Sequence, residues 1–221
     1  MTVYRTSLLG TPNIGIYALS TNSYTIVPPF VSDIKARKLS ECLNSKVIRS
    51  NICGTRLIGV FGVANSNGIV LPHFTSDEEV KAIKAILPLN VGRIEGKITA
   101  FGNLVLVNDN GGLASKLLLE EGLLNKIKEI LDVELVAGEI AGSQYVGSAA
   151  IATNKGVLTH PMLKEEEREL LLNVLKVNVD VGTINCGFPF VSSGILANDY
   201  GVVIGNLTTG LETMIISNVL E

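Results

Sequence analysis

The sequence predicts an α/β fold of five repeated units around a pseudo-fivefold axis, with helices outside and strands facing a central channel. Three observations predict it. A polar turn that ends in glycine recurs along the chain, a second glycine precedes each turn at a constant distance, and a helical pattern follows each turn. Periods of roughly 20–50 residues are the signature of repeat architectures, so they are considered before any single element.

The polar turn is clearest in the stretch Val60–Pro72, where Asn65-Ser66-Asn67-Gly68 separates two apolar runs. Glycine at the last position fits a short hairpin loop, because that residue usually adopts a positive φ. The turn recurs three times, and a fourth copy has tyrosine in place of glycine: Asn108–Gly111, Thr153–Gly156, Asn198–Gly201 and Thr21–Tyr24. The last turn positions are 24, 68, 111, 156 and 201, which are 43 to 45 residues apart.

A second position keeps the same register. Nine residues before each last turn position stand four glycines and one serine: Gly15, Gly59, Gly102, Gly147 and Ser192. Two marks at one period predict five units of about 44 residues, which together account for all 221 residues. We therefore expect a single domain that spans residues 1–221.

Each unit is expected to hold a strand pair around its turn, then a helix, then a strand that enters the next unit. In unit 1 the hairpin joins Ile14–Leu19 to Thr25–Pro29. The helix that follows is expected to begin at Ser32, and its apolar side is Ile34, Leu39 and Leu43.

Unit 2 has the clearest helix boundaries. Ser76 and Glu79 have the spacing of a capping box, in which each residue caps the other at the start of a helix. Pro88 is expected to end this helix, because proline cannot continue it. Its apolar face is then Val80, Ile83 and Leu87.

The remaining helices follow from the same periodicity. The sequence predicts one long helix in unit 3, with the stripe Leu123, Leu124, Ile127, Ile130 and Leu131. The helix of unit 4 begins with Glu165–Glu167, where the helix dipole favours carboxylates. In unit 5, Thr209 and Glu212 repeat the capping-box spacing, and the apolar face is Leu211, Met214, Ile215 and Val219.

The order of the elements predicts how the ring closes. The chain ends on a helix and begins on a strand, so Thr6–Leu9 is expected to supply the strand that unit 5 lacks. A closed ring removes the exposed strand edges that a line of five units would keep. The hairpin before each helix argues against a plain parallel βαβ sheet.

Composition bounds the class of protein. Hydrophobic residues make up 47% of the chain and charged residues 18%, which predicts a sizeable core and excludes a disordered chain. The start of the chain lacks the blocks of a secretory signal, and no apolar run approaches the roughly 18 residues of a membrane helix. We therefore expect a cytoplasmic protein. Three widely spaced cysteines fit small buried residues better than disulfides or a metal site: Cys42, Cys53 and Cys186.

Charge is unevenly distributed along the chain. Residues 1–110 hold 11 Lys and Arg against 7 Asp and Glu, whereas residues 111–221 hold 7 against 14. The first half is therefore basic and the second acidic, which can turn one side of a protein toward a polyanion. Two ordinary solvated surfaces would give the same counts.

Several short motifs follow one another in a fixed order: Asn13-Ile14-Gly15, Ile58-Gly59, Ala64–Pro72, Ala100-Phe101-Gly102-Asn103, Val146-Gly147-Ser148, Gly156–Pro161, Ala197-Asn198-Asp199 and Thr208-Thr209. With these residues, the chain from about residue 6 to about residue 219 resembles the translation initiation factor 6 family, the ribosome anti-association factors of archaea and eukaryotes. Eukaryotic members carry a polar tail after the last unit. This chain stops at Glu221, so it resembles the archaeal form.

The resemblance implies a pentein fold and binding to the large ribosomal subunit on the surface that meets the small subunit. Occupying that surface prevents subunit joining. This mechanism is steric and implies a monomer that is not an enzyme and needs no cofactor and no metal.

The repeat suggests which residues make the contact. Eight residues before each last turn position lie residues that should form a ring at one end of the molecule: Ile16, Val60, Asn103, Ser148 and Ser193. We expect these to bind the ribosome, with Asn103 in one of the best-matched motifs. The alternative is that they only fix strand geometry beside the turns.

A guanidine-modifying enzyme is the alternative function, because deiminases and amidinotransferases share the pentein fold. Their chemistry needs a cysteine nucleophile, a histidine and carboxylates that hold a guanidinium. Cys186 and His160 are the candidate pair, but the sequence shows no acidic partners at matching positions. His160 and His73 each lie beside a proline and fit ordinary turn residues.

Direct RNA binding is a third possibility, supported by the basic first half. Aromatic residues make up only 5% of the chain and tryptophan is absent, so a base-stacking platform is not expected. A ribosomal protein surface with some help from nearby RNA phosphate fits better.

Overall fold

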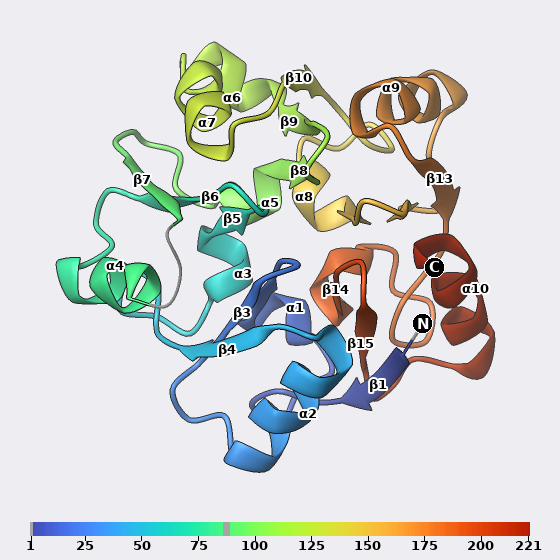
Figure 1. Cartoon of the computed structure of the whole chain (residues 1–221). Helices are drawn as coiled ribbons and strands as arrows, with labels where there is room; N and C mark the ends of the chain where they lie inside the picture. The colour runs from blue at the N-terminus through green and yellow to red at the C-terminus, as the bar shows by residue number, and fades with distance from the viewer. Residues whose placement is uncertain (1, 86–88) are drawn as a thin grey trace.

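The computed structural model describes residues 2–85 and 89–221. Within these residues, five three-stranded sheets surround one axis, with short helices near the axis and longer helices outside (Figure 1). This confirms the predicted α/β class and the five-unit repeat. We number the units 1 to 5 by their turns along the chain and call the boundary between consecutive units a seam.

Each sheet has an inner, a central and an outer strand. The inner strands are β2 (Leu19–Ser20), β5 (Val63–Ala64), β8 (Val105–Val107), β11 (Ala150–Ala152) and β14 (Ile195–Ala197). The central strands are β3 (Tyr24–Val27), β6 (Gly68–Pro72), β9 (Gly112–Ser115), β12 (Gly156–Thr159) and β15 (Gly201–Gly205). The outer strands are β4 (Lys46–Arg49), β7 (Asn90–Ile94), β10 (Leu135–Gly138), β13 (Asn178–Val181) and β1 (Thr2–Thr6).

Two sets of helices accompany the sheets. The inner helices are one turn long: α1 (Ile14–Tyr17), α3 (Ile58–Phe61), α5 (Phe101–Leu104), α8 (Val146–Ala149) and the 3₁₀ helix η1 (Val191–Gly194). The outer helices are α2 (Asp33–Leu43), α4 (Asp77–Lys84), α6 (Lys116–Glu120) with α7 (Leu124–Leu131), α9 (Glu165–Leu175) and α10 (Gly210–Leu220).

All five sheets have the same topology. The inner and central strands form the predicted antiparallel hairpin, and the outer strand pairs in parallel with the central one. In unit 4, for example, Ala150 lies opposite Thr159, and Gly156 lies opposite Asn178. The parallel strand arrives only after the outer helix, because a parallel connection needs a crossover of that length.

The ring closes between the two ends of the chain. β1 pairs in parallel with β15, from Thr2 opposite Gly201 to Thr6 opposite Gly205. Closure is therefore as predicted, but the strand is Thr2–Thr6 rather than Thr6–Leu9, and Leu8 pairs with Thr11 in a tight turn instead. β1 and α10 consequently lie beside each other (Figure 1), where Arg5 donates to the Thr213 hydroxyl over 3.1 Å.

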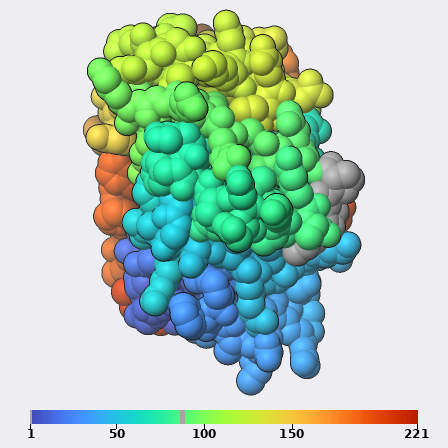
Figure 2. Space-filling view, turned by 90° about the vertical axis from the view of Figure 1, so that its left-hand side faces the viewer, coloured from blue at the N-terminus to red at the C-terminus, as the bar shows by residue number. Residues whose placement is uncertain are grey.

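Outer helices lock neighbouring units together. α2 packs against β1 and β15, α7 against β6 and β7, α9 against β9 and β10, and α10 against β12 and β13, so each helix covers the sheet of the preceding unit. Leu39 and Leu43 of α2, for instance, share a core cluster with Val203 of unit 5. Seen edge-on, units 1, 2 and 3 follow one another in close contact (Figure 2). No helix among the described residues is long and apolar enough to cross a membrane.

The apolar runs before the turns were predicted as strands, and that was wrong in part. In unit 2, Ile58–Phe61 forms α3, and only Val63–Ala64 forms a strand. A Cβ on Gly59 would overlap the carbonyl oxygen of Gly15, so the glycine lets neighbouring inner helices approach each other closely. One helical turn is too short to leave a periodic signal in the sequence.

The turn glycines also have a different role from the predicted one. Gly68, Gly111, Gly156 and Gly201 are not among the residues with positive φ. Instead, a Cβ at each would overlap a backbone carbonyl of the next unit's outer helix, such as that of Ile130 beside Gly68. Glycine is needed there for close approach between units.

Three helix predictions need correction. The long helix of unit 3 is interrupted at Gly122, whose φ is +69°, and forms α6 and α7. Ile34 of α2 is 69% exposed rather than buried. In α10, Leu211 and Met214 are exposed, whereas Ile216 and Leu220 are buried. Glu212 is also buried, and its carboxylate bonds a loop of its own unit.

The capping predictions are confirmed. Ser76 with Glu79 and Thr209 with Glu212 form capping boxes at the starts of α4 and α10. α9 begins at Glu165, as predicted. Ile83 is buried as expected, whereas Leu87 and Pro88 lie outside the described residues.

Candidate functional site

One end of the ring has a hollow of about 320 Å³ between the ends of the inner helices. We call this end the hollow face and the opposite end, where the polar turns lie, the turn face. All five residues predicted from the repeat are half-buried in the wall of the hollow: Ile16, Val60, Asn103, Ser148 and Ser193. The structure therefore brings together residues from all five units, and their binding role stays a prediction.

Backbone contacts between inner helices position these residues. A Cβ on Gly102 would overlap the carbonyl oxygen of Gly59, and one on Gly147 would overlap that of Gly102. Each inner helix thus rests directly on its neighbour, which fixes the residue that follows the glycine. Ser192 takes the glycine position in unit 5, where the inner helix η1 is 3₁₀ rather than α.

The wall of the hollow is neutral. The Ser148 hydroxyl donates to Asn103 Oδ1 over 3.1 Å, across the seam between units 3 and 4. The Ser193 hydroxyl donates to the Phe190 carbonyl over 2.8 Å, while Ile16 and Val60 offer only apolar surface. No lining residue is charged, so the hollow suits an uncharged protein surface better than a phosphate.

Aromatic side chains, which the sequence analysis missed, edge the hollow on units 4 and 5. Tyr145 is 55% exposed and Phe188 45% exposed, and both contribute to the wall. The Phe188 ring lies 6.0 Å from that of Phe190, centroid to centroid. The repeat identifies only positions shared by all units, whereas these aromatics lie in loops whose residue types differ from unit to unit.

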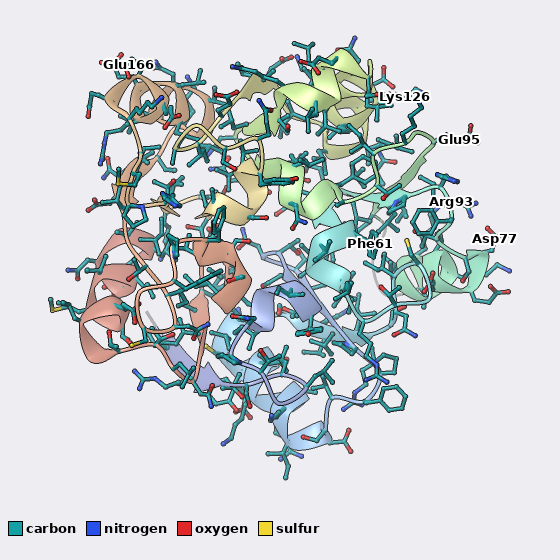
Figure 3. All side chains as sticks on the ribbon, turned by 180° about the vertical axis from the view of Figure 1, so that it is seen from behind. Phe61, Asp77, Arg93, Glu95, Lys126 and Glu166 are labelled. Carbon is teal, nitrogen blue, oxygen red and sulfur yellow. The ribbon has the colours of Figure 1, made fainter. Side chains whose placement is uncertain are left out.

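A second aromatic group lies on units 1 and 2. β3 and β6 start at the turn face, so the loops that follow them lie at the hollow face. There the Arg56 guanidinium lies 5.0 Å from the centroid of the Phe30 ring, which is 73% exposed. Phe74 packs edge-on against Phe61 at 6.0 Å and His73 at 5.2 Å. Figure 3 shows Phe61 on α3 near the axis, with Asp77 and Arg93 farther out.

Comparison with known proteins decides the family. The sequence model of the eIF-6 family matches residues 3–219. Translation initiation factor 6 of Methanocaldococcus jannaschii is 41% identical over 224 residues, covering 99% of this chain and 97% of its own. The factors of Staphylothermus marinus and Pyrococcus horikoshii are each 38% identical, covering 97% and 100% of this chain and 95% and 99% of their own.

The chain belongs to the eIF-6 family. This confirms the resemblance found from the short motifs. Membership supports a role in protein biosynthesis as a translation initiation factor. The match extends over all five units, including the loops that edge the hollow.

The candidate enzyme residues have other roles in this eIF-6 family member. His160 Nδ1 accepts the Met162 N–H over 3.1 Å, and its ring packs on Phe190. Burial lowers the pKa of His160, although the charge of Glu167 acts in the opposite direction. Cys186 donates its backbone N–H to Glu212, so the carboxylate beside this cysteine already holds the backbone and is not free to hold a guanidinium.

The cysteines are not all buried, contrary to the sequence prediction. Cys42 is buried, Cys53 is half-buried, and Cys186 is exposed at the tip of a loop. Cys186 has a φ of +68°, so the tight turn turns its side chain toward solvent. In the described ranges, no three His, Cys, Asp or Glu side chains are grouped in a way that could hold a metal ion.

Proposed function

We propose that this chain binds the large ribosomal subunit with its hollow face and sterically prevents premature joining of the small subunit. It acts as a cytoplasmic monomer with a pentein fold, one domain over residues 1–221, and without catalysis. Occlusion needs only affinity for one subunit, so no reacting group is required. Family membership supports the translation role, and the hollow supplies a surface that fits it.

The convergence of five repeat-related residues on one neutral hollow carries the proposal. Ile16 and Val60 offer apolar surface, and Asn103 offers an amide, as in the centre of a typical protein interface. Exposed Phe188 and Tyr145 add the aromatic side chains that dominate binding energies at such interfaces. The contact partner is therefore a ribosomal protein, with some help from RNA phosphate near the more basic first half of the chain.

Sedimentation with separated ribosomal subunits tests the proposal. At two salt concentrations, the wild-type chain should travel with the large subunit only, and subunit joining should fall. Asn103→Ala and Phe188→Ala should each weaken binding about tenfold or more, as expected for central interface residues. Asn218→Ala, at an exposed position of α10, is the matched control and should bind like wild type.

Two outcomes would contradict the proposal. A chain that stays free of both subunits does not act by occlusion. If the affinity falls steeply with salt and is unchanged by Asn103→Ala, phosphate contacts rather than the hollow bind the chain to the subunit.

A further inference from the structure

Three outer helices carry a glutamate with the same two-sided arrangement. Glu79, Glu167 and Glu212 are each the third residue of their helix, in α4, α9 and α10. One carboxylate oxygen of each accepts the backbone N–H of the residue before the helix. The distances are 2.9 Å from Ser76, 3.0 Å from Lys164 and 2.7 Å from Thr209.

The same carboxylates also hold the tip of a loop on the hollow face. Glu79 accepts the N–H groups of Cys53 and Gly54 at 3.1 and 2.8 Å. Glu167 does the same for Ala141 and Gly142, at 2.8 and 3.1 Å. Glu212 holds Cys186 and Gly187, at 3.1 and 2.8 Å.

The loop tips are shaped for this contact. Both N–H donors in each loop belong to residues with positive φ, for example 68° at Cys186 and 95° at Gly187. Successive N–H groups in such a turn point into one concavity that favours an anion. The carboxylate therefore fixes a strained turn that would otherwise leave two donors without a protein partner.

The loops that these carboxylates hold differ in the side chains that they place in the wall of the hollow. Phe188 follows Gly187 directly, and Tyr145 follows Gly142 by three residues; both side chains contribute to the wall. The loop held by Glu79 leads to α3 and places no aromatic side chain in the wall. In unit 1, Lys35 occupies the equivalent helix position and donates to the Ser7 carbonyl over 2.7 Å.

We propose that Glu212 and Glu167 are positioning residues of the hollow, which hold Phe188 and Tyr145 in the orientation that the partner binds. This inference rests on the proposed function. Neither carboxylate touches the partner; each acts through the backbone of its loop.

The electrostatics of Glu212 fit this role. Burial alone would raise its pKa, but backbone and hydroxyl donors from Thr209, Gly187 and Thr183 lower it to about 2. The carboxylate is therefore charged at neutral pH, and its hydrogen bonds are of the strong, charge-assisted kind. Replacement by glutamine keeps the size but removes the charge and one of the two acceptor oxygens.

The test compares Glu212→Gln with Glu79→Gln, its matched control, for affinity to isolated large subunits. Each variant loses a carboxylate that accepts two backbone N–H groups from a loop tip. Glu212→Gln should weaken binding about tenfold, and Glu79→Gln by less than about twofold. Equal affinities for the two variants would overturn the inference, because a purely structural role does not distinguish them.

A double variant tests whether Glu212 acts through Phe188. Glu212→Gln combined with Phe188→Ala should bind no more weakly than Phe188→Ala alone. If the double variant shows the product of the two single-variant losses of affinity, the inference is overturned. If Glu212→Gln does not fold, Glu167→Gln with Tyr145→Ala gives the same comparison at a carboxylate with fewer donors.

Amide hydrogen exchange of the free chain separates this inference from the proposed function. In Glu212→Gln, the amides of Cys186 and Gly187 should exchange faster than in wild type. If wild type binds and the variant binds equally well despite faster exchange, only the positioning role is overturned. If wild type itself does not bind the large subunit, the proposed function fails first and the inference with it.

Discussion

The seam between units 1 and 2 and the other four seams are built from different residues. At the four, the last turn position is glycine, and a Cβ there would overlap the carbonyl of the last but one residue of the next outer helix: Ile130, Val174, Val219 and Cys42. At the seam between units 1 and 2 the position is Tyr24. Its ring is fully buried, and its hydroxyl has no hydrogen-bond partner among the described residues.

The polar turns repeat this difference. The N–H of each second turn residue donates to a side-chain oxygen of the next turn: Ser66 to Asp109 at 2.8 Å, Asp109 to Asn154 at 2.9 Å, Asn154 to Asp199 at 2.8 Å and Asp199 to Asn22 at 3.0 Å. Among the described residues, no such bond joins Asn22 to Ser66, because the serine side chain is shorter than that of Asp or Asn.

The first turn residue makes a third kind of contact between units. The amides of Asn65, Asn108 and Asn198 donate to the last carbonyl of the next outer helix, as Asn108 does to Leu175 over 2.9 Å. Units 1 and 4 have Thr21 and Thr153 instead, whose hydroxyls bond only within their own turns, so among the described residues this contact is missing at two seams. At the turn face, four seams therefore rely on a glycine that approaches the next outer helix and on a hydrogen bond between turns, whereas the fifth buries an aromatic ring there.

Replacing the glycine at the last turn position of one of the four glycine seams should have the largest effect on stability. Gly156→Ala places a methyl group against the Val219 carbonyl, and we expect a loss of about 4 kcal/mol in the free energy of unfolding. Gly210→Ala is the control, because nothing lies within 4 Å of that Cβ position. Urea denaturation measures both; equal stabilities would show that the close approach does not matter.

Removing the side-chain amide of one first turn residue should have the next largest effect on stability. Asn108→Ala leaves the Thr153 carbonyl and the N–H groups of Asn110 and Gly111 without this partner, and it removes one of the two amides that donate to the Leu175 carbonyl. We expect a loss of about 3 kcal/mol, against about 1 kcal/mol for Thr21→Ala at the irregular seam. Thermal unfolding of the two variants checks the ranking, and a Thr21→Ala loss as large as that of Asn108→Ala would contradict it.

Tyr24→Phe should stabilise the irregular seam. The substitution keeps the buried ring and removes a hydroxyl that has no partner within residues 2–85 and 89–221, which makes its burial costly. Burial also raises the pKa of this phenol, since its charged form is disfavoured. We expect a gain of about 1 kcal/mol in denaturant unfolding. A loss of stability would mean that the hydroxyl is satisfied.

Ser66→Asn should have the smallest effect. The amide would keep the hydrogen bond to Asp109 of the next turn, as the Asn154 amide donates to Asp199. Its oxygen would accept the Asn22 N–H, as the Asn154 oxygen accepts the Asp109 N–H. We expect a gain of about 0.5 kcal/mol, and slower amide exchange at Asn22 should accompany it. Unchanged exchange at Asn22 would show that the missing bond was not restored.

Much of the fold follows from the sequence because the repeat is carried by local turn and capping chemistry. The hairpins and the capping boxes at Ser76 and Thr209 were predicted in this way. The order of the elements predicted the closure of the ring, although with Thr6–Leu9 rather than Thr2–Thr6 as the closing strand. The site residues Ile16, Val60, Asn103, Ser148 and Ser193 came from the same period, and their convergence on one hollow depends only on fivefold repetition.

Tertiary contacts decided the rest. The inner helices form where glycines such as Gly59 contact a neighbouring backbone. The turn glycines leave room for a backbone carbonyl of the next unit's outer helix. Phe188 and Tyr145 reach the hollow because Glu212 and Glu167 hold their loops from helices farther along the chain. Sequence patterns report what a residue does within its own turn or helix, whereas these contacts join residues that only the closed ring brings together.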